Sequence, residues 1–228
     1  QDETRSVLAI PAFRKLWNSM VFSSFGDWLG LLATTAMAQQ LSGGSYATAN
    51  FAIAGVFIAR LLPAVFLGPI AGVIADRFDR RKLMVTADIF RAALYISIPI
   101  VNTYFWLYAA MILVECLTLF WSPAKEATVP NLVGKDKLES ANQASLLAAY
   151  GTAPVAAILF SLLTLFATAI ESLFPFSIGD SVDIALYVNA ASFAFAALTI
   201  FGLKEIPKGA AAKKAKDEGV LKSLHDGW

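Results

Sequence analysis

Six long apolar runs decide which folds are open to this chain. Each is close to the length of about 20 mainly apolar residues that a helix needs to cross about 30 Å of hydrocarbon. The runs are too long, and alternate too little between polar and apolar residues, to be the strands of a membrane barrel. They span Leu16 to Leu41, Ala49 to Ala75, Leu83 to Val101, Phe105 to Trp121, Ala144 to Thr168, and Ile184 to Leu203. We therefore expect an all-α membrane protein with six transmembrane helices.

Turn-forming or charged segments separate the runs. They are Ser42-Gly43-Gly44-Ser45, Asp76 to Lys82, Asn102-Thr103, Ser122-Pro123 through Lys137, and Phe174-Pro175 through Asp183. Glycine, proline and small polar residues favour turns between regular elements. The sequence thus predicts a six-helix bundle over residues 16–203, with an N-terminal segment of residues 1–15 and a C-terminal segment of residues 204–228.

Composition supports a chain that lies in lipid and excludes several other functions. Hydrophobic residues make up 57% of the chain and charged residues 15%, whereas soluble domains average about 25% charged residues. A net charge of +1 argues against a nucleic-acid partner, because phosphates require a basic face. With Cys116 and His225 as the only cysteine and histidine, we expect no enzyme, no metal site and no cofactor.

The distribution of Lys and Arg predicts how the bundle is oriented. With a cytoplasmic N-terminus, the inside segments hold groups of three, four, three and six basic residues, 16 of the 18 in the chain. The remaining two, Arg60 and Arg91, lie within apolar runs, so the expected outside loops hold none. Because basic loops stay on the cytoplasmic side, we predict a multi-pass inner-membrane protein with both ends in the cytoplasm.

The segment from Gly72 to Lys82 reads Gly-x-x-x-Asp-Arg-x-x-Arg-Arg-Lys and places four basic residues between the second and third runs. At Gly72, Asp76, Arg77, Arg80 and Arg81 it resembles the loop signature of the major facilitator superfamily. The chain as a whole resembles the N-terminal six-helix half of such a transporter, most closely in the drug-efflux branch that includes macrolide and enterobactin exporters. Fragments typical of that branch are Phe13-Arg14-Lys15-Leu16-Trp17, Phe25-Gly26-Asp27-Trp28-Leu29, Ala59-Arg60-Leu61-Leu62-Pro63, Ser122-Pro123-Ala124 and Asn189-Ala190-Ala191-Ser192-Phe193.

This resemblance implies a 12-helix fold in which substrate lies between two halves, with residues 204–228 at the start of the central cytoplasmic loop. It implies that the Gly72 to Lys82 segment latches the second helix to the partner half when the cytoplasmic side is closed; a role in topology alone is the alternative. Gly151 and Pro154 match part of the fifth-helix motif of antiporters, but Ala156-Ala157 follow where further glycines are typical. The fourth run offers Glu115 where many proton-coupled antiporters carry a basic residue.

Ionisable residues inside a membrane are costly and often functional. Five lie within the runs: Asp27, Arg60, Asp88, Arg91 and Glu115. We expect Asp27 to face a central cavity, where it either takes up a proton or binds a cationic substrate, with Arg60 as its partner; a static buried ion pair is the alternative.

Asp88 and Arg91 share a helix face because they are three residues apart. Glu115 comes at a similar depth on the next run, so the sequence suggests an Arg91–Glu115 pair that acts either as a gate or as a link between helices.

Smaller signals complete the prediction. Gly68 and Gly72 form a small-residue face suited to close helix packing, and Pro63 and Pro69 are expected to kink the second helix. The aromatic residues Trp28, Tyr150, Phe160 and Phe166 are candidate cavity-lining residues, and Asn142, Gln143 and Ser145 are expected to cap the fifth helix or line an inner vestibule.

The expected function is proton-coupled export of an amphipathic small molecule by alternating access. The expected partners are membrane lipid, the small-molecule substrate and a second six-helix half, from the same gene or a separate subunit. The alternative is a non-transporting membrane scaffold or assembly subunit built from the same bundle. The sequence does not separate export from uptake or lipid flipping.

Overall fold

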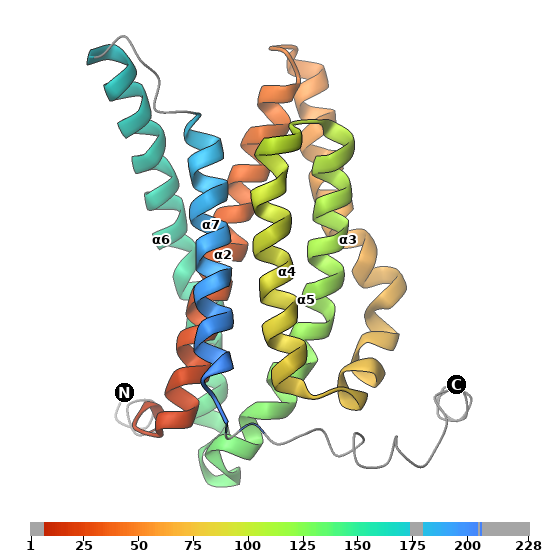
Figure 1. Cartoon of the computed structure of the whole chain (residues 1–228), viewed down its shortest axis with the longest axis vertical. Helices are drawn as coiled ribbons and strands as arrows, with labels where there is room; N and C mark the ends of the chain where they lie inside the picture. The colour runs from red at the N-terminus through yellow and green to blue at the C-terminus, as the bar shows by residue number, and fades with distance from the viewer. Residues whose placement is uncertain (1–6, 174–179, 205, 207–228) are drawn as a thin grey trace.

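The computed structural model describes residues 7–173, 180–204 and 206, apart from the side chains of residues 69, 73–77 and 170–173. Within these residues the chain forms six long helices and no strand, and Figure 1 shows successive helices running in alternate directions. A 3₁₀ turn, η1 (Lys135–Lys137), precedes the fifth of them. The helices are α2 (Pro11–Leu41), α3 (Tyr46–Arg77), α4 (Arg80–Val101), α5 (Tyr104–Val133), α6 (Leu138–Leu173) and α7 (Ser181–Phe201).

Five helices contain a segment long and apolar enough to cross a membrane: Tyr46–Gly68, Arg80–Val101, Tyr104–Val133, Lys135–Ala169 and Ser181–Phe201. Helix α2 is not among these five, although it has 31 residues. Polar side chains such as Ser19, Ser23 and Asp27 interrupt its apolar sequence. The structure therefore supports five of the six predicted spans by length and composition.

The tight turns form where the sequence predicted them. Gly43 and Gly44 have φ angles of +63° and +87°, which only glycine adopts freely, in the turn between α2 and α3. Ser45 then caps α3, and its side chain accepts the backbone N–H of Thr48. Between α4 and α5, Asn102 is left-handed and Thr103 caps α5 through the N–H of Trp106.

Two predicted breaks were too wide. Helix α5 was expected to end at Trp121, but it continues through Pro123 and Pro130 to Val133. A membrane helix tolerates proline because groups of neighbouring helices can bond to the backbone carbonyls that proline leaves without a donor. The charged segment Asp76 to Lys82 is also mostly helical, because only Phe78 and Asp79 separate α3 from α4, and Asp79 caps α4.

We call the end of the bundle where α2 begins and α7 ends the basic end, because Arg14, Lys82, Lys125 and Lys204 lie there. Helix α2 packs mainly on α7 and α6, α4 on α7 and α5, and α3 on α5. Two apolar cores follow each other along the bundle. Leu29, Tyr95 and Met111 belong to the core away from the basic end, and Phe13, Met84 and Ile200 to the core near it.

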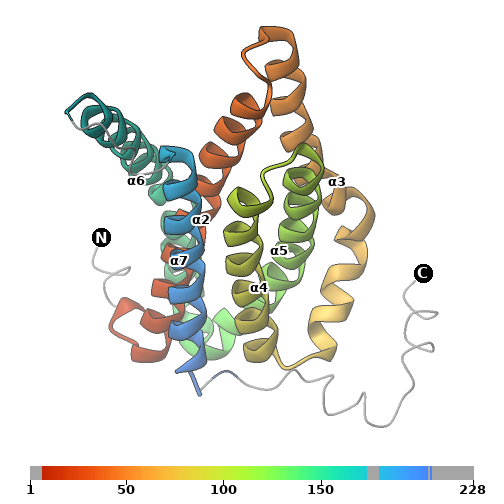
Figure 2. The ribbon, with the colours of Figure 1, turned by 45° about the horizontal axis from the view of Figure 1, so that its top comes forward.

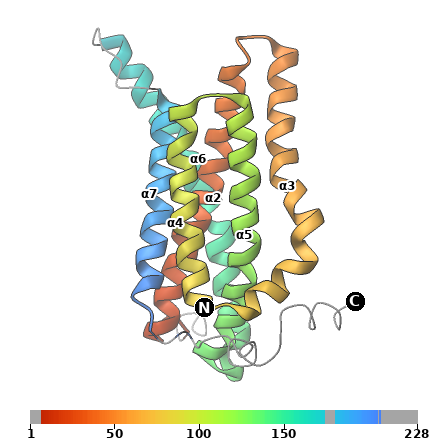
Figure 3. The same cartoon turned by 45° about the vertical axis from the view of Figure 1, so that its right-hand side comes forward.

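Helices α3 and α6 form the two flanks. Figure 2 shows their ends away from the basic end spreading to opposite sides of the bundle, and Figure 3 shows that α3 bends along its length. Pro63 and Pro69 lie in α3, and each lacks the N–H of a regular helical bond. Both flanks expose large apolar side chains, including Leu61 and Phe66 on α3 and Ile158 and Leu165 on α6.

Candidate functional site

The structure places Asp27 and Arg60 at one cavity of about 340 Å³ in the middle of the bundle. We call it the Asp27 cavity. Its walls come from three helices that are distant in sequence: Ser24, Asp27, Trp28 and Leu31 of α2, Arg60 of α3, and Ala149 and Tyr150 of α6. A cavity of this size falls in the range of about 300–1,000 Å³ that is usual for small-molecule sites.

Arg60 pairs with Glu115 rather than with Asp27. The Nε atom of Arg60 lies 3.0 Å from Oε1 of Glu115, and both side chains are mostly buried. Asp27 forms no salt bridge with any residue that the structure describes. The predicted Asp27–Arg60 partnership is therefore limited to sharing a cavity. Since Glu115 offsets the charge of Arg60, an ionised Asp27 gives the cavity an unbalanced negative charge.

Arg91 pairs with Asp88, so the suggested Arg91–Glu115 pair was wrong. Both members of the Asp88–Arg91 pair are completely buried, with Nη1 of Arg91 3.3 Å from Oδ1 of Asp88. Nη1 of Arg91 also donates to the Ser23 hydroxyl at 3.1 Å, and the Trp121 indole donates to Oδ2 of Asp88 at 3.1 Å. The guanidinium lies 5.1 Å from the ring centre of Phe193 and 5.5 Å from that of Trp121. The cluster links α4 to α2, α5 and α7.

Arg80 and Arg81 of the predicted gating segment donate hydrogen bonds to backbone carbonyls of other parts of the same bundle. Arg80 donates from Nη1 to the backbone carbonyl of Ala127 in α5 at 2.9 Å. Arg81 donates to the carbonyl of Leu203, just beyond α7, at 3.5 Å, and its guanidinium lies 6.0 Å from the Phe201 ring centre. Basic side chains favourably meet the carbonyls at helix C-termini. The side chains of Asp76 and Arg77 lie outside what the structure describes.

The small-residue face of α3 has no neighbour in this structure. A Cβ atom added to Gly68 or Gly72 would meet no described atom within 4 Å. These glycines therefore do not mediate packing inside the described bundle.

A different glycine pair supports close packing within the bundle. A Cβ on Gly26 would lie 2.5 Å from Oγ of Ser192, and one on Gly30 would lie 2.5 Å from both Nδ2 of Asn189 and the Tyr95 hydroxyl. Sequence reasoning missed this pair, although its spacing of four residues is the same signal that drew attention to Gly68 and Gly72.

Two tryptophans tie α2 to α6. The indole N–H of Trp17 donates to the carbonyl of Ala144, and that of Trp28 donates to the carbonyl of Ala149, both at 2.8 Å. Trp28 thus forms one wall of the Asp27 cavity in a fixed position.

The fifth-helix motif lies on the exposed side of α6. Gly151 and Pro154 are both exposed, and a Cβ on Gly151 would closely approach only Leu147 of the same helix. Ala156, where the antiporter pattern expects glycine, is completely buried. Helix α6 continues through Pro154.

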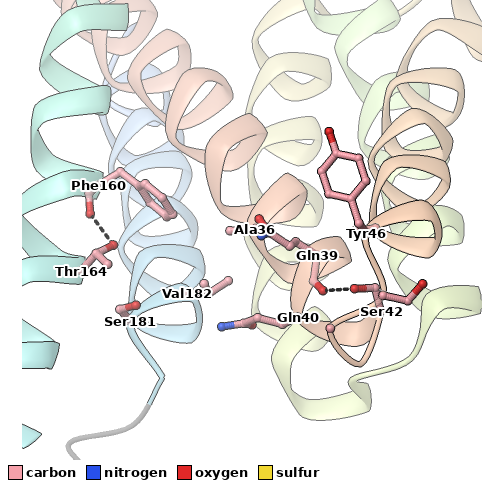
Figure 4. A pocket seen from close by; sticks show the side chains of 12 residues that line it. Ala36, Gln39, Gln40, Ser42, Tyr46, Phe160, Thr164, Ser181 and Val182 are labelled. Carbon is pink, nitrogen blue, oxygen red and sulfur yellow. Dashed lines mark hydrogen bonds between the residues drawn. The ribbon is translucent and has the colours of Figure 1, made fainter.

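Further cavities lie toward both ends of α6. One of about 590 Å³ at the basic end, here called the basic-end cavity, includes the predicted vestibule residues Asn142 and Ser145. Another of about 520 Å³ lies at the opposite end, where Figure 4 shows Phe160 and Thr164 of α6 across from Gln39 and Tyr46. Two of the predicted cavity aromatics, Trp28 and Tyr150, line the Asp27 cavity, and Phe160 lines the cavity in Figure 4.

The chain matches the family model of transmembrane secretion effectors over residues 3–228. YfiS of Bacillus subtilis (strain 168), named an uncharacterized MFS-type transporter, is 27% identical over 213 residues, which are 92% of this chain and 46% of YfiS. Rv0037c of Mycobacterium tuberculosis, also named an uncharacterized MFS-type transporter, is 30% identical over 149 residues, 64% of this chain and 33% of that protein.

Macrolide efflux protein A of Enterococcus faecalis is 34% identical over 109 residues, 44% of this chain and 34% of the relative. The chain thus spans less than half the length of these curated relatives. The relatives are named for transport and efflux, which agrees with the expectation that the chain is not an enzyme. The chain is a multi-pass membrane protein, and it belongs to the transmembrane secretion effector family of the major facilitator superfamily (MFS).

Proposed function

We propose that this chain forms the N-terminal half of a secondary transporter that exports an amphipathic small molecule by alternating access, driven by a proton gradient. The observation that carries this proposal is the Asp27 cavity, in which a carboxyl without a salt-bridge partner stands beside the Arg60–Glu115 pair. A carboxyl that lacks a permanent counter-ion can gain or lose a proton without breaking a salt bridge. It can also attract a cationic group of the substrate when it is ionised.

The lining of the cavity suits an amphipathic compound. Trp28, Leu31 and Tyr150 offer apolar surface, whereas Ser24, Asp27 and Arg60 offer polar groups. Small-molecule sites commonly combine a largely apolar wall with a few polar groups that orient the ligand. The name of the relative from Enterococcus faecalis, a macrolide efflux protein, supports export of a compound of this kind.

A second six-helix half is the proposed partner of the exposed flanks. Gly68 and Gly72 give α3 a face on which another helix can approach closely, and no described residue occupies that face. In this proposal Gly72, Asp76 and Arg77 contact the partner half when the cytoplasmic side closes. Arg80 and Arg81 hold α4 against α5 and the segment after α7 through the carbonyls of Ala127 and Leu203.

The proposed orientation has both ends of the half in the cytoplasm and α2 as the sixth span, in an inner membrane. The basic residues of the described loops and helix ends gather at the basic end, which supports a cytoplasmic location for that end. Helix α2 lies at the centre of the bundle, packed on α7, α6, α3 and α5, so its polar residues need not face lipid.

Transport by the full-length gene product in proteoliposomes tests this function. The probes are a labelled macrolide, a lipophilic cation and a neutral amphipathic dye, each measured with and without an imposed pH gradient. We expect gradient-dependent flux of at least one probe, and probe-driven proton movement that Asp27→Asn abolishes. Glu139→Gln is the matched control and should retain both, because it removes an exposed carboxyl of α6 that lines neither the Asp27 cavity nor the basic-end cavity. Two outcomes would contradict proton coupling through Asp27: probe flux that is the same with and without the pH gradient, or probe-driven proton movement that is unchanged in Asp27→Asn.

A further inference from the structure

The Asp27 cavity and the basic-end cavity meet at the same turn of α6. Ala149 and Tyr150 line both of them, and no other residue is shared between the two linings. From the basic end, the first cavity lies against the α6 segment from Leu138 to Tyr150, and the second opens beyond Tyr150 at Asp27. The side chain at position 150 thus stands at the boundary between them.

Of the two aromatic residues at this boundary, one is fixed and one is free to turn. The Trp28 indole is held by its 2.8 Å hydrogen bond to the carbonyl of Ala149. The Tyr150 side chain is 66% exposed, and its hydroxyl bonds to no residue that the structure describes. Its own carbonyl also lacks the usual helical donor, because Pro154, four residues later, has no N–H.

The basic-end cavity has the two-sided lining that an amphipathic solute requires. Asn142 and Ser145 of α6 provide uncharged polar groups, whereas Val129, Leu138 and Leu146 provide apolar surface. The cavity has two charged residues, Lys125 and Glu126. Nζ of Lys125 lies 3.9 Å from Oε1 of Glu126, so their charges offset each other. A solute there meets no unbalanced charge, in contrast to the single unpaired carboxyl in the next cavity.

We propose that the basic-end cavity is an entry site for the amphipathic solute and that Tyr150 is the movable partition through which it reaches Asp27. This inference rests on the proposed transport function for the identity of the solute, but the partition itself can be tested without transport. Trp28 forms the fixed edge of the passage, and rotation of the Tyr150 ring opens it. Removal of the ring should therefore make the Asp27 cavity more accessible from the basic end.

Cysteine labelling of the full-length protein in membrane vesicles provides the test. Cys116 and any cysteine of the full-length protein outside residues 1–228 are first replaced by serine, and a single cysteine is then placed in the Asp27 cavity (Ser24→Cys) or in the basic-end cavity (Ser145→Cys). A bulky, membrane-impermeant methanethiosulfonate reagent is added on the side from which Ser145→Cys reacts. With Tyr150 intact, Ser24→Cys should react several-fold more slowly than Ser145→Cys.

Tyr150→Ala should raise the labelling rate of Ser24→Cys several-fold and leave that of Ser145→Cys unchanged. Tyr150→Phe should keep the slow rate, since the ring and not the hydroxyl forms the partition; it also remains informative if the alanine variant folds poorly. Leu146→Ala is the matched control, because Leu146 is an exposed α6 residue that lines only the basic-end cavity. It should not change labelling of Ser24→Cys.

Equal labelling of Ser24→Cys with tyrosine or alanine at position 150 would overturn the partition, as would an equal effect of Leu146→Ala. Failure of the transport proposal looks different. In that case the labelling rates respond to Tyr150 as described, but proteoliposomes move none of the probes with or without a pH gradient.

Discussion

Arg91 is a buried charge that contacts side chains of four helices, its own included. It is completely buried, pairs with Asp88, donates to Ser23 and lies against the rings of Trp121 and Phe193. Because a buried charge is costly without its partner, the two members of the Asp88–Arg91 pair depend on each other. Neither member of the pair lines the Asp27 cavity, and the effect predicted for the pair is on folding.

Arg91→Ala should destabilise the protein by about 3–5 kcal/mol, because it leaves the Asp88 carboxyl unpaired in the interior. The measurement is the midpoint of thermal unfolding in detergent. The double variant Asp88→Asn with Arg91→Met removes both charges and should recover most of the lost stability. A single variant as stable as the parent, or a double variant worse than Arg91→Ala, would show that the pair does not hold the helices together.

The sequence singled out the five ionisable residues within the apolar runs, but it did not predict which of them pair. Burial cost singles out any charge within an apolar run. Which charges meet depends on how each helix is rotated about its axis and on which helices are neighbours. Glu115 is reached by Arg60 because α3 packs on α5, and Arg91 is satisfied within its own helix by Asp88. The Asp88–Arg91 pair could have been predicted, because residues three apart lie on the same face of a helix.

At the scale of helices, two glycine pairs with the same spacing have opposite surroundings. Gly26 and Gly30 of α2 face buried polar side chains on α7 and α4, whereas Gly68 and Gly72 of α3 face no described atom. The pattern of small residues predicts close packing in both cases. Which face packs within one half and which is left for another partner follows only from the arrangement of all six helices.

Gly30→Ala should therefore destabilise the bundle, while Gly68→Ala should not. The new Cβ of Gly30→Ala would lie 2.5 Å from Nδ2 of Asn189 and from the Tyr95 hydroxyl, and both of those side chains are completely buried. Overpacking of this kind costs about 1–3 kcal/mol. Gly68→Ala adds a methyl group to open space, and alanine favours a helix over glycine by about 1 kcal/mol. Thermal unfolding of both variants, made in this 228-residue chain without a partner half, decides the matter: equal losses of stability would be inconsistent with the described packing.

Helix lengths were the least accurate part of the sequence prediction. Pro123 marked a break at the end of the fourth run, yet α5 passes through it and ends 10 residues later at Val133. Charged residues likewise suggested a loop where α3 and α4 are separated by two residues. An apolar run indicates the part of a helix that lies in the hydrocarbon core of the bilayer, and the helix can continue beyond that core. The Ser42 to Ser45 turn was placed correctly because left-handed glycines require a turn there.

At the scale of the whole molecule, the location of α2 decides whether the described bundle has five or six spans. An odd number of crossings would place the ends of the six-helix region on opposite sides of the membrane, and an even number would place them on the same side. Helix α2 is not among the segments that meet the hydropathy requirement, but Figure 1 shows that it runs along the bundle beside the other helices. Two of its polar residues contact other helices: Ser19 donates to the carbonyl of Ala196 and Ser23 accepts from Arg91.

We predict that α2 crosses the membrane and that the basic end is cytoplasmic. In a Cys116→Ser background, single cysteines at the exposed positions Arg14 and Lys82 should react with an impermeant reagent only in inside-out vesicles. Cysteines at the exposed positions Gln39 and Tyr46 should react only in right-side-out vesicles. Tyr46 and Lys82 flank spans that already meet the length and hydropathy requirement, so they fix the orientation independently of α2. Labelling of Arg14→Cys and Gln39→Cys from the same side would mean that α2 does not cross the membrane.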